Sequence, residues 1–229
     1  NSPFDSHSVS VGMDGLGTLT FHGEGGDSAT SANDTSAAGN VWDNFDDAGA
    51  ITPTAVGSGD NMMTYTLPAI MDGVSIMASY LPTGSGAESA TGVAITYTGI
   101  DGLSATYASG DGTSDGTDQT VMKASYAVGP VTIAASDHSY DTTGTSADNE
   151  MRGYKISYTV SDEISVTYGT ETFDSGETAV DAEYSGVSVA YTSGGMTITA
   201  VSEEAENVSY STTSTEDVDY WGLTVAFAF

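Results

Sequence analysis

From Asn61 to Phe229 the chain repeats one pattern, in which apolar positions alternate with small or polar ones and a turn-forming cluster follows. Alternation with a period of two places successive side chains on opposite sides of the backbone, which is the geometry of a β-strand. Two shorter segments before residue 23 alternate in the same way. The pattern predicts thirteen strands, at residues 7–13, 16–22, 61–69, 73–81, 92–99, 102–109, 119–128, 131–139, 149–160, 163–173, 179–192, 195–204 and 216–229.

The connections between these strands alternate in length. Tight links, such as those at residues 14–15, 100–102 and 129–130, take turns with longer links rich in Gly, Ser, Thr, Asp and Glu, and the longest is 23–60. An up-and-down sheet with tight hairpins at one end and long loops at the other is typical of outer-membrane barrels. We therefore predict an all-β fold, a transmembrane up-and-down antiparallel β-barrel, with residues 1–229 forming a single domain.

The alternation separates bulky apolar side chains from small or polar ones. In the final strand Trp221, Leu223 and Val225 share one face, whereas Gly222 and Thr224 share the other. A soluble barrel would turn the bulky face inward and a membrane barrel would turn it outward to lipid, so alternation alone leaves both choices open.

Aromatic residues favour the membrane choice because they gather at two levels of the predicted strands. Rings at both levels, with an aliphatic band between them, are typical of the girdles of a membrane barrel. The level near the tight turns contains Tyr97, Tyr126, Tyr158, Tyr191 and Phe227. The level towards the long loops contains Tyr80, Tyr107, Tyr168 and Trp221.

Composition narrows the classes further. Three Lys or Arg against 32 Asp or Glu give a formal net charge of −29, which excludes nucleic acid as a partner. No run of 18 apolar residues is present, so the sequence predicts no membrane-spanning helix. Because the strands are built from apolar and small residues, the acids are expected on the loops.

The last residues, Asp219 to Phe229, resemble the final strand of Gram-negative porins, which ends in a carboxy-terminal Phe read by the assembly machinery. Phe229 would be that assembly signal. Residues 12–20, with the step Gly17-Thr18, resemble the porin hairpin that precedes the long constriction loop. The resemblance is to the general-diffusion porins of the acidic type known from marine or phototrophic bacteria, and it implies an outer-membrane location.

In trimeric general-diffusion porins the long third loop folds into the barrel. This chain has two predicted strands before residues 23–60 and eleven after, so the resemblance implies a barrel of sixteen strands, an even number as bacterial barrels require. We expect the first three strands to lie before Asn1, because an open sheet edge in a bilayer would leave backbone groups unpaired.

If 23–60 is the constriction loop, its acids Asp43, Asp46 and Asp47 would line the pore constriction and favour cations. Trp42 or Phe45 would anchor the loop to the wall. The alternative is that these acids are ordinary solvated loop residues.

Porins usually oppose the acidic edge with basic residues on the barrel wall, which creates a transverse field across the pore. Lys123 and Lys155 fall in phase with small polar residues and are expected to line the pore, as are His22 and His138. Arg152 is in phase with the bulky face and would meet lipopolysaccharide phosphates.

The sequence has no motif for a required cofactor or for catalysis. Acid-rich stretches offer oxygen ligands for calcium, but none has the spacing of a complete calcium loop, so any metal site is unknown. Serines are abundant without the motifs that surround a nucleophile, so the chain is not expected to be an enzyme.

These observations favour a homotrimeric outer-membrane porin that lets ions and small hydrophilic solutes diffuse passively, with preference for cations, and that contacts membrane lipid and lipopolysaccharide. The alternative from another class is a secreted or surface-attached acidic β-sandwich that acts as an adhesin or calcium-dependent binding module. A third hypothesis is a substrate-specific porin, which would show additional aromatic residues in the lumen or a ladder of binding residues.

Overall fold

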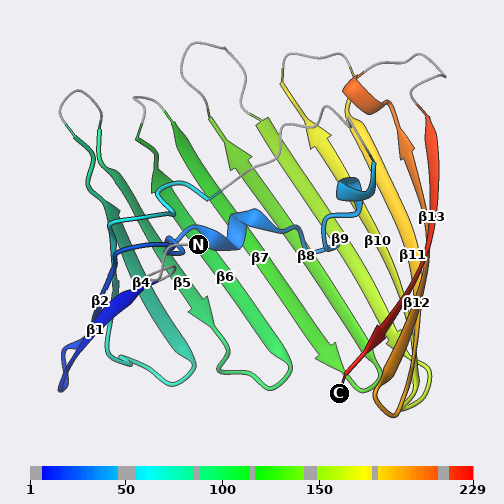
Figure 1. The fold of residues 1–229 in the computed structure, drawn as a ribbon, viewed down its shortest axis with the longest axis horizontal. Coiled ribbons are helices and arrows are strands. Elements are labelled where there is room, and N and C mark those ends of the chain that lie inside the picture. Colours follow the sequence, from blue (N-terminus) through cyan, green and yellow to red (C-terminus); the bar gives the residue numbers. More distant parts are fainter. Residues whose placement is uncertain are drawn as a thin grey trace. The chain divides into compact units, whose positions relative to one another are not determined.

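The fold was examined in a computed structural model, which describes residues 7–45, 55–84, 88–113, 117–141, 149–176, 180–210 and 217–228. Thirteen strands form a sheet whose order follows the chain, each hydrogen-bonded to its neighbours in sequence (Figure 1). The strands are β1 (Ser8–Met13), β2 (Gly17–His22), β3 (Met62–Thr66), β4 (Val74–Leu81), β5 (Ala90–Tyr97), β6 (Leu103–Asp111), β7 (Asp118–Val128), β8 (Val131–Tyr140), β9 (Asn149–Thr159), β10 (Ile164–Asp174), β11 (Ala182–Ser193), β12 (Met196–Glu206) and β13 (Val218–Phe227).

All thirteen predicted strands are confirmed, with ends that shift by three residues at most. Two ends shift by three residues: the strand predicted at 179–192 begins at Ala182, and the strand predicted at 61–69 ends at Thr66. Pro68 follows closely and has no amide hydrogen to continue the ladder, which explains the early end. In the tight turn before β4, Gly73 has φ 75°, and a Cβ there would lie 2.3 Å from the Gly99 nitrogen. Only glycine fits such a turn.

The chain divides into two compact units. The first unit comprises Asn1–Asp34, Pro53–Lys123 and His138–Asp148, and the second comprises Thr35–Thr52, Ala124–Asp137 and Asn149–Phe229. Short 3-10 helices lie in the connections: η1 (Ser31–Asp34), η2 (Val41–Asn44) and η3 (Val208–Tyr210). Within the described residues, no helix is both long enough and apolar enough to cross a bilayer.

In the first unit, the sheet has one face covered by the long connection and one exposed face. Ala94 and Ala108, which pair across β5 and β6, lie on the covered face and are buried with Ala29 of the connection. Ile95 and Tyr107 pair on the exposed face, where 44% and 45% of their surface is accessible. The bulky side chains are therefore the exposed ones, as a membrane barrel requires.

The second unit shows the same division. Phe173 and Tyr184 lie on its covered face and are buried with residues of the connection. Ile156 and Tyr168, paired across β9 and β10, are exposed on the other face. In both units the bulky side chains are exposed, which is the opposite of their placement in a soluble protein. This decides the choice between a soluble and a membrane barrel, which the alternation left open.

The expected position of the acids is wrong for part of the chain. Glu171 in β10 and Glu203 in β12 are strand residues on the covered face of the second unit. Register explains the placement, because Glu171 lies opposite buried Tyr184, and Glu203 lies opposite Gly186. A carboxylate can occupy such a position when the segment that covers it supplies hydrogen-bond donors.

Candidate functional site

In the first unit the long connection is fastened to the sheet by hydrogen bonds from its backbone. The amide of Ala29 donates to Ser79 Oγ over 3.0 Å, and the amide of Val56 donates to Gln119 Oε1 over 2.7 Å. Thr30 Oγ1 donates to the carbonyl oxygen of Val56 over 3.3 Å, which links the outgoing and returning parts of the connection. All these residues are buried, so each bond gives a polar group the hydrogen-bond partner that water cannot provide there.

Glycines let this part of the connection approach the strands closely. A Cβ on Gly110 would lie 2.8 Å from Thr30 Cγ2 and 3.1 Å from Val56 Cγ2. Gly92, which pairs with Gly110, would place a Cβ 3.4 Å from the Ala29 Cβ. Because these two glycines have no side chain, residues 28–34 can pack directly against the backbone of the strands.

Asn33 in η1 meets His138 in β8 at the same covered face. His138 Nδ1 lies 2.7 Å from Asn33 Oδ1, and neither side chain has accessible surface. The expectation that His138 lines an open lumen is therefore corrected: it shares the covered face but lies wholly beneath the connection. Its burial follows from the packing of η1, which sequence periodicity does not reveal.

The second unit fastens the connection through one carboxylate. Glu171, only 1% exposed, accepts a hydrogen bond from Ser36 Oγ, and its Oε2 accepts another from the amide of Trp42 over 3.0 Å. Gly153 lies opposite Glu171 in β9, and a Cβ there would come within 3.0 Å of the Ser36 Cβ. Charge-assisted bonds of this kind are stronger than neutral ones, so Glu171 holds both ends of the segment 36–42.

Aromatic rings reinforce this attachment. Trp42 meets Phe173 edge-on, with ring centroids 6.2 Å apart, and Phe45 lies 5.7 Å from Tyr184. Phe45 also meets Tyr220 of β13 at 6.3 Å. Both Trp42 and Phe45, the two anchors that the sequence offered as alternatives, contact the sheet.

Of the predicted acids of the constriction, the structure describes Asp43, which lies between the two anchors in the sequence. Asp43 belongs to η2 and is exposed, whereas Asp46 and Asp47 lie outside the described residues. Beside Asp43, the side-chain nitrogen Nδ2 of Asn44 donates to Glu203 Oε2 over 2.8 Å. Glu203 is thereby a second acid near η2.

The predicted pore-lining bases occupy the covered-face phase of their strands. Lys155 pairs with Gly169, which packs against Ala38 of the connection, and Lys123 follows buried Val121 by two residues. His22 Nε2 lies 3.1 Å from Thr64 Oγ1 of β3. The structure thus places these side chains on the face that the prediction requires, while their contact with a pore stays a prediction.

Arg152 lies in the exposed-face phase of β9, beside Tyr154. It forms ion pairs with Asp137, at 3.3 Å, and with Glu150. Part of its charge is therefore already compensated by the protein, and its contact with lipopolysaccharide phosphates stays a prediction.

The predicted girdle residues lie on the face opposite the long connection. Most are exposed, and Tyr97 at the end of β5 is partly buried. Tyr97 pairs with Val74, the first residue of β4, and Tyr191 pairs with Ile164, the first residue of β10, so both lie beside tight turns. Their role in a bilayer stays a prediction.

The predictions of calcium on the acidic loops and of Phe229 as the assembly signal are not tested by the structure. In the part of the chain that the structure describes, no group of three His, Cys, Asp or Glu side chains gathers as metal ligands, so calcium on the acidic loops stays a prediction. Phe229 lies outside the described residues.

Sequence reasoning missed Glu171. It is the only acid on the small-residue face of its strand, where Thr167 and Gly169 precede it with a period of two. An acid on this face was the signal that could have been noticed. The groups that donate hydrogen bonds to it, however, are more than a hundred residues away in the chain.

Known structures share this fold. An anion-selective porin from Comamonas acidovorans aligns with a TM-score of 0.61 and 13% identity over 88% of this chain and 67% of its own. A further porin structure aligns with a TM-score of 0.64 and 17% identity over 94% and 78%. OmpT, an outer-membrane protein of Vibrio cholerae, gives 0.62 and 13% over 97% and 79%. At these identities the likeness shows the fold alone.

Comparison of the sequence with known families is more specific than the likeness in fold. A comparison with curated protein sequences gives no match. The family described as Gram-negative porin, however, matches residues 1–202, which is most of the chain. The chain therefore belongs to the Gram-negative porin family, whose members are non-enzymatic β-barrel channels of the outer membrane.

Proposed function

We propose that this porin forms a water-filled, cation-selective channel for passive diffusion of ions and small hydrophilic solutes. One observation carries the proposal: the acidic long connection is fastened to the sheet face that bears small and polar side chains, while bulky side chains are exposed on the other face. In a bilayer the bulky face would meet lipid, and the connection would lie on the water-filled side. A β-sandwich would bury its bulky face between two sheets, so the adhesin alternative loses its basis.

The segment 23–60 is the proposed constriction. Its exposed Asp43 follows the Trp42 anchor directly, and the sequence continues to Asp46 and Asp47. Glu203, held by Asn44, adds a further carboxylate at the same part of the second unit. Carboxylates held at a narrow point attract cations and repel anions.

The fold by itself does not decide the sign of the selectivity, since one protein with this fold is an anion-selective porin. Charge decides it. Lys123 and Lys155 on the covered face oppose a preference for cations, but the chain carries 32 acids against three Lys or Arg. The balance supports cation selectivity.

Reversal potentials in a potassium chloride gradient test this proposal, with the full-length porin reconstituted in planar bilayers. We expect the sign that corresponds to cation preference, and a smaller potential for Asp43→Asn. The change should be less than about twofold, because exposed charges are screened over roughly 10 Å in dilute salt. Asp101→Asn, at an exposed tight turn, is the matched control and should change nothing. Anion preference of the unchanged protein would contradict the proposal.

We also propose a homotrimer whose exposed faces meet membrane lipid, lipopolysaccharide and neighbouring subunits. The support is the series of exposed apolar side chains on the first strands, including Val9, Val11 and Phe21. Contiguous apolar surface of this kind is covered by lipid or by another subunit in membrane proteins. Light scattering of the detergent-solubilised protein should give three chains per particle before heating, and a monomer would contradict the proposal.

A further inference from the structure

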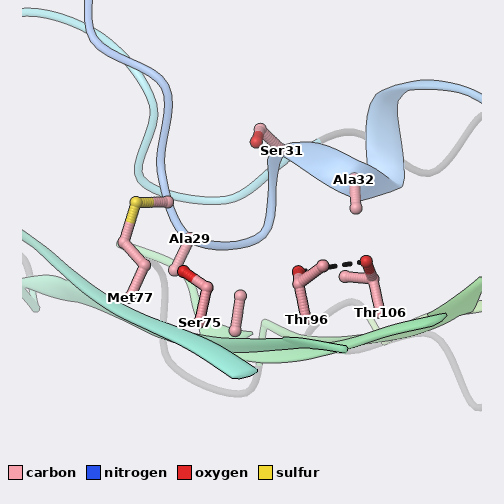
Figure 2. Close-up of a pocket in the computed structure, with 8 residues that line it drawn as sticks. Ala29, Ser31, Ala32, Ser75, Met77, Thr96 and Thr106 are labelled. Atoms are coloured by element: carbon pink, nitrogen blue, oxygen red, sulfur yellow. Dashed lines mark hydrogen bonds between the residues drawn. The ribbon is translucent and has the colours of Figure 1, made fainter. Parts of the chain in front are cut away.

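A cavity of about 330 Å³ lies in the first unit, between the long connection and the covered face of β4, β5 and β6 (Figure 2). This volume is at the lower end of the range for small-molecule pockets in proteins, roughly 300–1,000 Å³. Its lining residues are Ala29, Ser31, Ala32, Ser75, Met77, Ala94, Thr96 and Thr106.

The wall of the cavity has two parallel rows, which the strand register defines. Ser75 pairs with Thr96, and Thr96 pairs with Thr106, so three hydroxyl side chains follow one line across the strands. In the next line, Met77 pairs with Ala94. A row of hydroxyl groups therefore runs beside a row of apolar groups.

The roof of the cavity is held in place by contacts outside the lining. The Ala29 amide donates a hydrogen bond to Ser79 Oγ, and the side chain of Asn33 in η1 is hydrogen-bonded to His138. Figure 2 shows Ser31 and Ala32 of η1 on the side of the cavity opposite Thr96 and Thr106. Because this roof is fastened at both ends, the space beneath it is preformed rather than opened by a ligand.

The lining has the chemistry of a site for an uncharged, hydroxyl-rich molecule. None of its eight residues is ionisable, in a chain with 32 acids. Thr96 Oγ1 and Thr106 Oγ1 bond each other over 3.1 Å, and each hydroxyl has one donor and two acceptor positions, so the pair keeps capacity both to donate and to accept. The methyl groups and the Met77 thioether offer an apolar surface to C–H groups.

We propose that this cavity is a binding subsite for uncharged polyhydroxylated solutes of about monosaccharide size. Such a solute has hydroxyl groups at its edge and C–H groups on its face, which match the two rows of the wall. The proposal rests on the channel function above, because it assigns a resting place to a solute on its way through the pore. A charged solute of the same size would lose hydration there without gaining an opposite charge.

The probe is glucose, added to the full-length porin in single-channel recordings in potassium chloride. Bound glucose obstructs ion flow, so conductance, corrected for the conductivity of the bulk solution, should fall to a plateau with half-saturation in roughly the millimolar range. Gluconate, a charged relative of the same size, should cause no saturable fall.

Two variants locate the effect. Thr106→Val keeps the shape but removes a hydroxyl, and it should raise the half-saturating glucose concentration about tenfold, as expected for one lost hydrogen bond. Ala94→Leu fills the cavity and should abolish saturation. Thr167→Val is the matched control, because its hydroxyl also bonds a cross-strand partner, Ser157 Oγ at 2.9 Å, but lies outside the cavity.

The outcomes separate the two proposals. Saturation that is lost in Ala94→Leu, weakened in Thr106→Val and kept in Thr167→Val supports the subsite. A channel that conducts potassium chloride without saturable response to glucose, or that responds equally to gluconate, overturns the subsite and leaves the channel intact. No conductance from the unchanged protein overturns the channel function itself.

Discussion

The long connection is attached in two places, and the two attachments differ in chemistry. In the first unit, residues 28–34 rest on small side chains and glycines through hydrogen bonds between uncharged groups. In the second unit, residues 36–45 are held mainly by the buried carboxylate of Glu171 and by packed aromatic rings, beside one neutral hydrogen bond from the Ala37 amide to Ser136 Oγ.

The difference shows how one connection can serve two purposes. Small side chains let the first segment approach closely but leave a cavity beneath η1. In the second segment Trp42 and Phe45 join a buried cluster with Phe173 and Tyr184, so attachment there is more apolar. The second segment is thus held by a buried apolar cluster, whereas the first leaves the space in which we placed the proposed subsite.

The largest expected effect comes from the aromatic cluster. Phe173→Ala should lower the free energy of unfolding by about 4 kcal/mol, because a fully buried ring that touches Trp42 and Tyr184 is lost and a cavity remains. Urea unfolding in detergent micelles measures it. Tyr168→Ala, in the same strand but on the exposed face, is the control. Equal losses in the two variants would remove the distinction between the faces.

A smaller effect is expected at the carboxylate. Glu171→Ala leaves the Ser36 hydroxyl and the Trp42 amide without their acceptor, which should cost about 3 kcal/mol of local stability. Hydrogen exchange of the Trp42 amide should accelerate accordingly. Glu183→Ala, at an exposed strand position, should leave that exchange unchanged. Unaltered exchange in Glu171→Ala would mean that the rings and the bond from the Ala37 amide to Ser136 Oγ hold the segment without Glu171.

The smallest effect is expected in the first unit. Gly110→Val would press a side chain against Thr30 and Val56 of the connection and against the Thr91 carbonyl oxygen, 2.6 Å from such a Cβ, and overpacking of this kind costs about 2 kcal/mol. The Ala29 amide should then exchange faster, since its segment is displaced from Ser79. Gly12→Val in β1 is the control, because nothing lies within 4 Å of a Cβ there. If exchange of the Ala29 amide is the same in both variants, the close approach over Gly110 is not what holds residues 28–34 against the sheet.

Sequence patterns predicted the fold well but the attachment poorly. Strand positions and faces followed from alternation, and both candidate anchors, Trp42 and Phe45, were identified correctly. Glu171, Gln119 and Ser79 were not, because nothing local marks a strand residue as the acceptor for a distant backbone amide. The sequence likewise shows the glycines at 92, 110 and 153 only as small residues. Their role in the close approach of the connection depends on the folded structure.

The sequence by itself determined the thirteen strands, the division into a bulky and a small-residue face, and the membership in an outer-membrane family. The strands and faces depend on a period of two, which is a property of neighbouring residues, and the membership depends on the family match over residues 1–202. Only the tertiary structure decided which face the long connection covers, which polar groups fasten it and where a cavity remains. Those features depend on contacts such as that between Trp42 and Glu171, 129 residues apart, and burial there exists only once the chain has folded.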